Sequence, residues 1–156
     1  MMTIKTLYEQ DFQQWIEQTI EQLQNSDFTS LDIEHLIEEL TDLGKSEKRA
    51  LKSNLMVLLA HLLKLSIQYD APETMKSSWY SSVLEHRKRV LVDLEDTLSL
   101  KPYLTTAIEQ AYPNARDLAT AQSKLAKFGV RVPEEKEYPI ACPFTIEQIL
   151  DEEFYG

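Results

Sequence analysis

Residues 46–69 place the strongest limit on the fold. If this segment is helical, its apolar side chains leave only a narrow polar strip; they are Leu51, Leu55, Met56, Leu58, Leu59, Leu62, Leu63 and Ile67. A helix that is apolar on nearly every side needs neighbours on most of those sides. The segment is therefore predicted to be a central helix that begins at a Ser46 cap and ends before Pro72.

Three further long segments have helical periodicity. Apolar residues recur at steps of three and four in residues 6–23, 31–43 and 74–98. The first segment is predicted to open at Thr6, with Glu9 at capping-box spacing. The second is predicted to end at Gly44, because glycine is the preferred residue just after a helix. Its apolar stripe is expected to pack within the helical bundle; this stripe consists of Ile33, Leu36, Ile37, Leu40 and Leu43.

The last third of the chain combines short helices with an extended segment. Residues 102–112 and 113–128 are predicted to be two helices, the second closed by Gly129. Residues 130–144 contain three prolines amid charge and are expected to be extended. A terminal helix is predicted for residues 145–153, where Thr145 and Gln148 have the spacing of a capping box.

These segments predict an all-α fold, an antiparallel bundle of four main helices with two or three short additional helices and an extended C-terminal segment. The length of 156 residues fits one helical domain, with residues 1–129 as the bundle and residues 130–156 packed on it. Only three glycines are present, so a glycine-rich phosphate-binding loop is not expected.

The net charge and the cysteine content limit the cellular compartments and the classes of binding partner that we expect. The net charge of −10 repels nucleic acid, and the basic cluster at residues 85–89 is followed at once by acidic residues. The start of the chain lacks a secretory pattern, and the single Cys142 cannot form an internal disulfide. The apolar stretch 55–67 is shorter than the roughly 20 residues of a bilayer span. We therefore expect a cytoplasmic protein that binds neither nucleic acid nor a membrane.

No metal site or cofactor is expected. The three histidines fall one each on the second, third and fourth predicted helices. Dicarboxylate metal sites in bundles use Glu-x-x-His, whereas the nearest match here, His35 followed by Glu38, has the reverse order. Cys142 is interpreted as a small buried thiol rather than a nucleophile.

Five residues form the candidate cleft, and they lie on the second, third and fourth predicted helices: Glu38, Glu39, His61, His86 and Arg87. His86 and Arg87 interrupt an apolar face, so a buried guanidinium would need a partner such as Glu38 or Glu39. The structural interpretation is such an ion pair between helices, with histidines that serve packing. The functional interpretation is an anion or substrate site formed by Arg87, His86 and His61. His61 also lies on a polar strip that either faces solvent or forms a buried network; the strip consists of Glu47, Asn54, His61 and Gln68.

Five blocks of sequence resemble the bacterial, largely cyanobacterial family known as domain of unknown function 29. They are residues 7–12 with Trp15, residues 36–40 leading to 43–49, residues 61–64, Ser78 with Trp79, and residues 142–145 leading to 148–151. Two positions depart from the family pattern, Leu65 where Trp is common and Tyr80 where Arg is common. The resemblance implies a small all-helical soluble protein and supplies no reaction, ligand or partner.

The leading hypothesis for function is a protein-interaction module without catalytic activity, with a protein partner or a homodimer. It rests on amphipathic helices, an acidic surface and the lack of a catalytic arrangement of recognised spacing. The alternative is an enzyme or a small-ligand or metal-binding protein that uses the candidate cleft.

Overall fold

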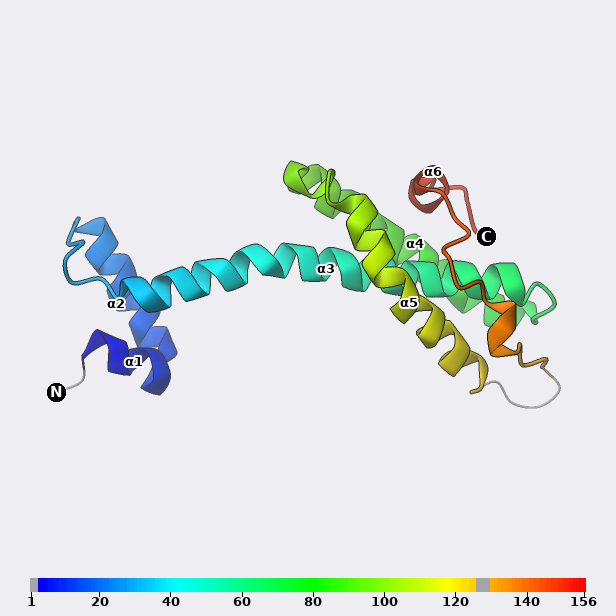
Figure 1. Ribbon diagram of the computed structural model, residues 1–156, viewed down its shortest axis with the longest axis horizontal. Helices are drawn as coiled ribbons and strands as arrows, with labels where there is room; N and C mark the ends of the chain where they lie inside the picture. The colour runs from blue at the N-terminus through cyan, green and yellow to red at the C-terminus, as the bar shows by residue number, and fades with distance from the viewer. Residues whose placement is uncertain (1–2, 126–129) are drawn as a thin grey trace. The chain divides into compact units, whose positions relative to one another are not determined.

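The computed structural model describes residues 3–125 and 130–156. Its elements are α1 (Ile4–Gln10), α2 (Phe12–Gln24), α3 (Ile33–Ile67), α4 (Glu73–Asp96), α5 (Leu104–Ser123) and α6 (Ile146–Leu150), with the 3-10 helices η1 (Leu98–Leu100) and η2 (Glu135–Glu137) (Figure 1). These two ranges contain no strand, so the predicted all-α class is confirmed. The chain divides into two compact units, the N-terminal unit (residues 1–46) and the C-terminal unit (residues 47–156).

The N-terminal unit contains α1, α2 and the first turns of α3. The prediction of one helix over residues 6–23 is wrong, because Asp11 separates two helices, α1 and α2. The Asp11 carboxylate accepts a hydrogen bond of 3.1 Å from the Gln14 backbone N–H and so caps α2. The cap of α1 is Thr3 rather than Thr6, since the Thr3 hydroxyl accepts from the Thr6 N–H.

Helix α3 is continuous from Ile33 to Ile67, so the predicted end at Gly44 and the predicted start at Ser46 are both wrong. Glycine inside a helix costs only about 0.5–1 kcal/mol relative to alanine, and the backbone hydrogen bonds of a continuous helix offset this. By length and composition α3 could also cross a membrane, but half of its most apolar window is buried inside the protein. The core helix of a globular protein has the same property.

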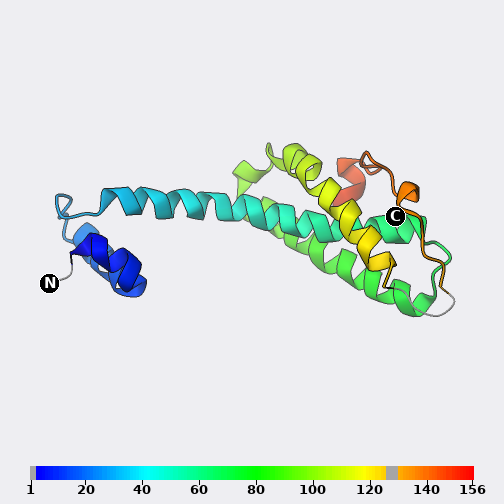
Figure 2. The same cartoon turned by 60° about the horizontal axis from the view of Figure 1, so that its bottom comes forward.

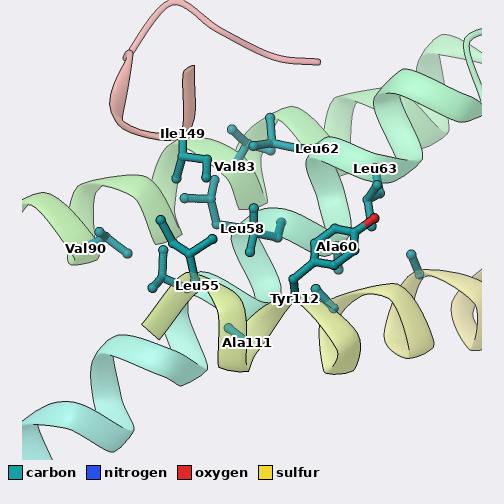
Figure 3. Close-up of a cluster of buried hydrophobic side chains, with 14 of the residues drawn as sticks. Leu55, Leu58, Ala60, Leu62, Leu63, Val83, Val90, Ala111, Tyr112 and Ile149 are labelled. Atoms are coloured by element: carbon teal, nitrogen blue, oxygen red, sulfur yellow. The ribbon is translucent and has the colours of Figure 1, made fainter. Parts of the chain in front are cut away.

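The core of the C-terminal unit forms around the second half of α3, as predicted. α4 runs back along this part of α3, and α5 crosses α3 at an angle (Figures 1 and 2). Figure 3 shows how Leu55, Leu58 and Leu62 of α3 point towards side chains from the other helices. These contacting side chains are Val83 and Val90 of α4, Ala111 and Tyr112 of α5, and Ile149 of α6.

Helix α5 joins two segments that were predicted to be separate. It runs from Leu104 to Ser123 with Pro113 inside it, and Pro113 lies on the exposed side. Proline lacks an N–H and so removes one hydrogen bond of the helix, but the surrounding alanines are buried and keep the two halves in line. The predicted helix end at Phe128 and Gly129 lies outside the described residues.

The C-terminal segment is mostly extended, as predicted, and carries one short 3-10 helix, η2. It is fixed to α5 by Arg116, whose Nε donates to the carbonyl of the buried Tyr138 at 2.9 Å. The predicted capping box of α6 is confirmed: the Thr145 side chain accepts from the Gln148 N–H, and the Gln148 side chain accepts from the Thr145 N–H.

The continuity of α3 predicts the effect of two substitutions. A Cβ at Gly44 would meet no atom within 4 Å. Gly44→Ala should therefore raise the free energy of unfolding by about 0.5–1 kcal/mol, and Ser46→Ala should raise it by a few tenths. Urea titration followed by far-ultraviolet circular dichroism measures both. Destabilisation by both variants would show that the helix breaks at residues 44–46, because each would then remove a cap.

Candidate functional site

A buried carboxylate organises the N-terminal unit. Asp32 is 1% exposed and precedes the first turn of α3. Its Oδ2 accepts a hydrogen bond of 3.2 Å from the indole Nε1–H of Trp15 and lies 2.6 Å from His35 Nδ1. Burial alone would raise the pKa of Asp32, but the hydrogen bonds from His35 and Trp15 outweigh it and hold the pKa below its ordinary value. These bonds fix α2 to the start of α3.

Tyr8 attaches α1 to the same part of α3. Its ring stacks on the imidazole of His35 with centroids 3.9 Å apart, and its hydroxyl donates to the Glu39 carboxylate. Because that hydrogen bond favours the protonated phenol, the pKa of Tyr8 rises to about 12. Glu39, a predicted cleft residue, therefore holds α1 in place. Glu38 lies one position further back along α3 and is exposed.

An apolar stripe on α3 remains exposed beside this network. We call Ile33, Ile37, Leu40 and Leu43 the α3 stripe; their exposed fractions are 50%, 59%, 59% and 65%. The expectation that these side chains pack within a bundle is therefore wrong. Four further apolar side chains of the same unit are also exposed, namely Phe12, Ile20, Leu23 and Phe28. Scattered apolar residues are ordinary on a protein surface, but a regular row on one helix is typical of an interaction site.

The acidic charge of the protein is concentrated in the N-terminal unit. Residues 1–46 contain two lysines and ten acidic residues, a net charge of −8, whereas residues 47–156 contain 14 basic and 16 acidic residues, a net charge of −2. On α3 the acids Glu38 and Asp42 lie about 150° around the helix from the α3 stripe, because successive residues turn by about 100°. The apolar and acidic sides of this helix are therefore separate.

His61 and His86, two more of the predicted cleft residues, do meet. They lie on the neighbouring helices α3 and α4, and the Ser82 hydroxyl is 3.4 Å from His61 Nδ1 and 3.3 Å from His86 Nδ1. Each Nδ1 is also 2.8 Å from a carbonyl oxygen one turn earlier, which makes it a hydrogen-bond donor. Neither Nδ1 is then free to accept the Ser82 proton, so the cluster is not a serine–histidine pair for nucleophilic catalysis. Burial lowers the pKa of His61 and favours its neutral form.

Arg87 has a different partner from the one predicted. Its side chain is buried, 2% exposed, and its Nε donates to the Ile149 carbonyl at 2.8 Å while Nη2 donates to the Phe154 carbonyl at 2.6 Å. The guanidinium also lies 5.5 Å from the Tyr155 ring centroid. Backbone carbonyls of the C-terminal segment, not Glu38 or Glu39, take the Nε and Nη2 donors. Nη1 is buried without a hydrogen-bond partner among the described residues.

A groove beside Arg87 offers no clear anion site. Its volume is about 280 Å³, and its lining includes two carboxylates. The lining residues are Leu84, Arg87, Lys88, Leu91, Val92, Glu95 and Glu152. Because Glu95 and Glu152 balance the two cations, the groove has no net positive charge.

Sequence reasoning did not single out Lys64 as a buried group. Lys64 lies near the end of α3, is buried, donates to Gln122 and sits over the Trp79 ring. Burial lowers its pKa to about 8. One turn later, Gln68 donates to Ser123 at 2.8 Å and to the Tyr138 hydroxyl at 3.1 Å. The predicted polar strip is therefore exposed at its first residue, Glu47. Its last residue, Gln68, lies just after α3 and is buried among hydrogen-bond partners.

Metal-ligating side chains do not gather in the described part of the chain: no group of three His, Cys, Asp or Glu residues could hold an ion there. Cys142 is half-buried, and burial raises the pKa of its thiol. A raised pKa keeps the thiol protonated and unreactive near neutral pH.

The family whose profile is described as "Domain of unknown function DUF29" matches residues 7–155. The chain belongs to the DUF29 family. The resemblance drawn from the sequence blocks is thus confirmed. No curated protein and no solved structure matches this DUF29 protein.

The Asp32–His35 pair predicts how the stability of the N-terminal unit depends on pH. The hydrogen bond to Asp32 raises the pKa of His35 above 6.5, so its contribution is complete below pH 6.5 and is lost as the pH rises through the raised pKa. The lowered pKa of Asp32 makes its contribution complete above pH 3.8 and lost as the pH falls further. Stability should therefore be greatest between these two values.

Tryptophan fluorescence can follow this unit alone. The chain has two tryptophans, so Trp79→Phe leaves Trp15 as the only reporter. The urea midpoint of unfolding should fall as the pH rises above 6.5, and the additional change His35→Gln should remove that dependence. A midpoint that falls equally in the His35→Gln variant would contradict the role of the pair.

Proposed function

We propose that this DUF29 protein is a non-catalytic, cytoplasmic protein-interaction module that binds another protein chain through the α3 stripe. The exposure of this stripe carries the proposal. Fully burying a Leu or Ile side chain contributes about 1.5–3 kcal/mol. Four such side chains at half to two thirds exposure therefore leave roughly 3–7 kcal/mol of burial unused on one helix face.

The N-terminal unit holds the α3 stripe in a defined position. Asp32 joins Trp15 of α2 to the start of α3, and Tyr8 of α1 contacts both His35 and Glu39. A side chain that is already ordered loses less conformational entropy on binding. The polar residues of this unit therefore support the presentation of an apolar surface.

The chemistry of the predicted cleft supports a non-catalytic function. Both Nδ1 atoms of His61 and His86 donate to carbonyls, and Arg87 donates through Nε and Nη2 to the C-terminal segment. Glu39 accepts from Tyr8. Each of these groups has a structural partner in its own unit. The free thiol of Cys142 and the acidic surface suit the reducing cytoplasm.

A photo-cross-linking amino acid tests this function inside cells. Placed at position 40, p-benzoylphenylalanine should give adducts with a protein chain on irradiation, because Leu40 lies in the middle of the α3 stripe. Leu98 provides the matched control position, since it is 64% exposed but belongs to the C-terminal unit. Adducts that are lacking at position 40, or equally strong at both positions, would contradict the proposal.

A further inference from the structure

We propose that the chain bound by the α3 stripe is a second copy of this protein, with the two α3 helices packed antiparallel about a two-fold axis. This inference rests on the proposed function and names its partner. The surface involved is the N-terminal unit's part of α3, from Ile33 to Lys45.

The spacing of the α3 stripe makes it complementary to itself. The stripe residues lie at positions 33, 37, 40 and 43, so reversing one helix brings Ile33 opposite Leu43 and Ile37 opposite Leu40. A two-fold axis repeats each of these pairs, as expected for an interface that uses the same patch on both subunits. Every stripe side chain then has an apolar partner of similar size.

Charge along α3 favours the antiparallel arrangement. Residues 33–42 contain four acidic residues and no Lys or Arg, whereas residues 45–52 contain four basic residues and one acidic residue. Lys45, Lys48 and Arg49 are exposed. In an antiparallel pair this basic segment begins beyond the end of the stripe, level with the acidic start of the other copy's α3, where Glu34 lies. A parallel pair would instead place the two basic segments side by side.

The acidic residues of the stripe region do not oppose such a dimer. Glu38 and Asp42 lie on the side of α3 away from the stripe, so they point out of the interface in both copies. At physiological ionic strength, charges further apart than about 8 Å are largely screened. The net charge of the unit therefore does not keep two stripes apart.

Sedimentation equilibrium of the full chain tests the dimer. At roughly 100 μM, well above a micromolar Kd, the protein should have twice its chain mass of 18.1 kDa. Leu40→Asp places a charge at the interface in both copies and should raise the dissociation constant at least ~100-fold. Leu98→Asp, the matched exposed leucine, should leave the dimer intact. A monomeric wild type, or a dimer that survives Leu40→Asp, would overturn the inference.

Single cysteines test the orientation. In a Cys142→Ser background, Ile33→Cys mixed with Leu43→Cys should form a disulfide between the two variants under mild oxidation. Neither variant should cross-link with itself, because ten residues of helix separate the like positions by about 15 Å, beyond disulfide reach. Self-cross-linking of either variant would overturn the antiparallel arrangement.

The mass of the photo-cross-linked adduct from position 40 separates the two proposals. An adduct of two copies of this chain supports both. An adduct of another mass, with a monomeric wild type, overturns the second-copy inference and leaves the interaction function standing. No adduct at all overturns both.

Discussion

The second half of α3 is apolar on nearly every side, and the need to cover it determines the C-terminal unit. α4 and α5 pack along it, and α6 covers a further side through Ile149. Polar side chains that enter this core have hydrogen-bond partners inside it, although Gln68 Oε1 and Arg87 Nη1 have none among the described residues. Arg87 donates to the C-terminal segment, and Gln68 contacts Ser123 and Tyr138. The core therefore determines both the positions of the helices and the conformations of these side chains.

The sequence predicts the helices better than it predicts their ends. The central position of the 46–69 segment follows from hydrophobicity alone, and the Thr145 cap follows from side chains that lie three residues apart. Gly44 was misleading because a glycine can either end a helix or lie inside it, and its neighbours decide which. The Asp11 cap was missed because the apolar period continues across it. A sequence pattern therefore predicts a hydrogen bond such as a helix cap when its two residues lie close together in the sequence.

The candidate site was only partly predictable for the same reason. His61 and His86 come together around Ser82, as helical spacing on two neighbouring helices allows. The partners of Arg87 lie about 60 residues later and are backbone carbonyls, which no side-chain pattern reveals. The exposure of the α3 stripe was also hidden, because an amphipathic helix has the same pattern whether its apolar side meets its own chain or another one.

The hydrogen bonds of Arg87 make the integrity of the core depend on a short stretch of tail. A protease that removed residues 149–156 would remove both carbonyls that accept from Arg87. It would also remove the buried Ile149 and so uncover apolar side chains of the core. Exposed apolar surface in a core is costly, so clipping there would loosen the helices as well as shorten the chain. Damage at this end of the protein would thus become a signal for degradation of the whole C-terminal unit.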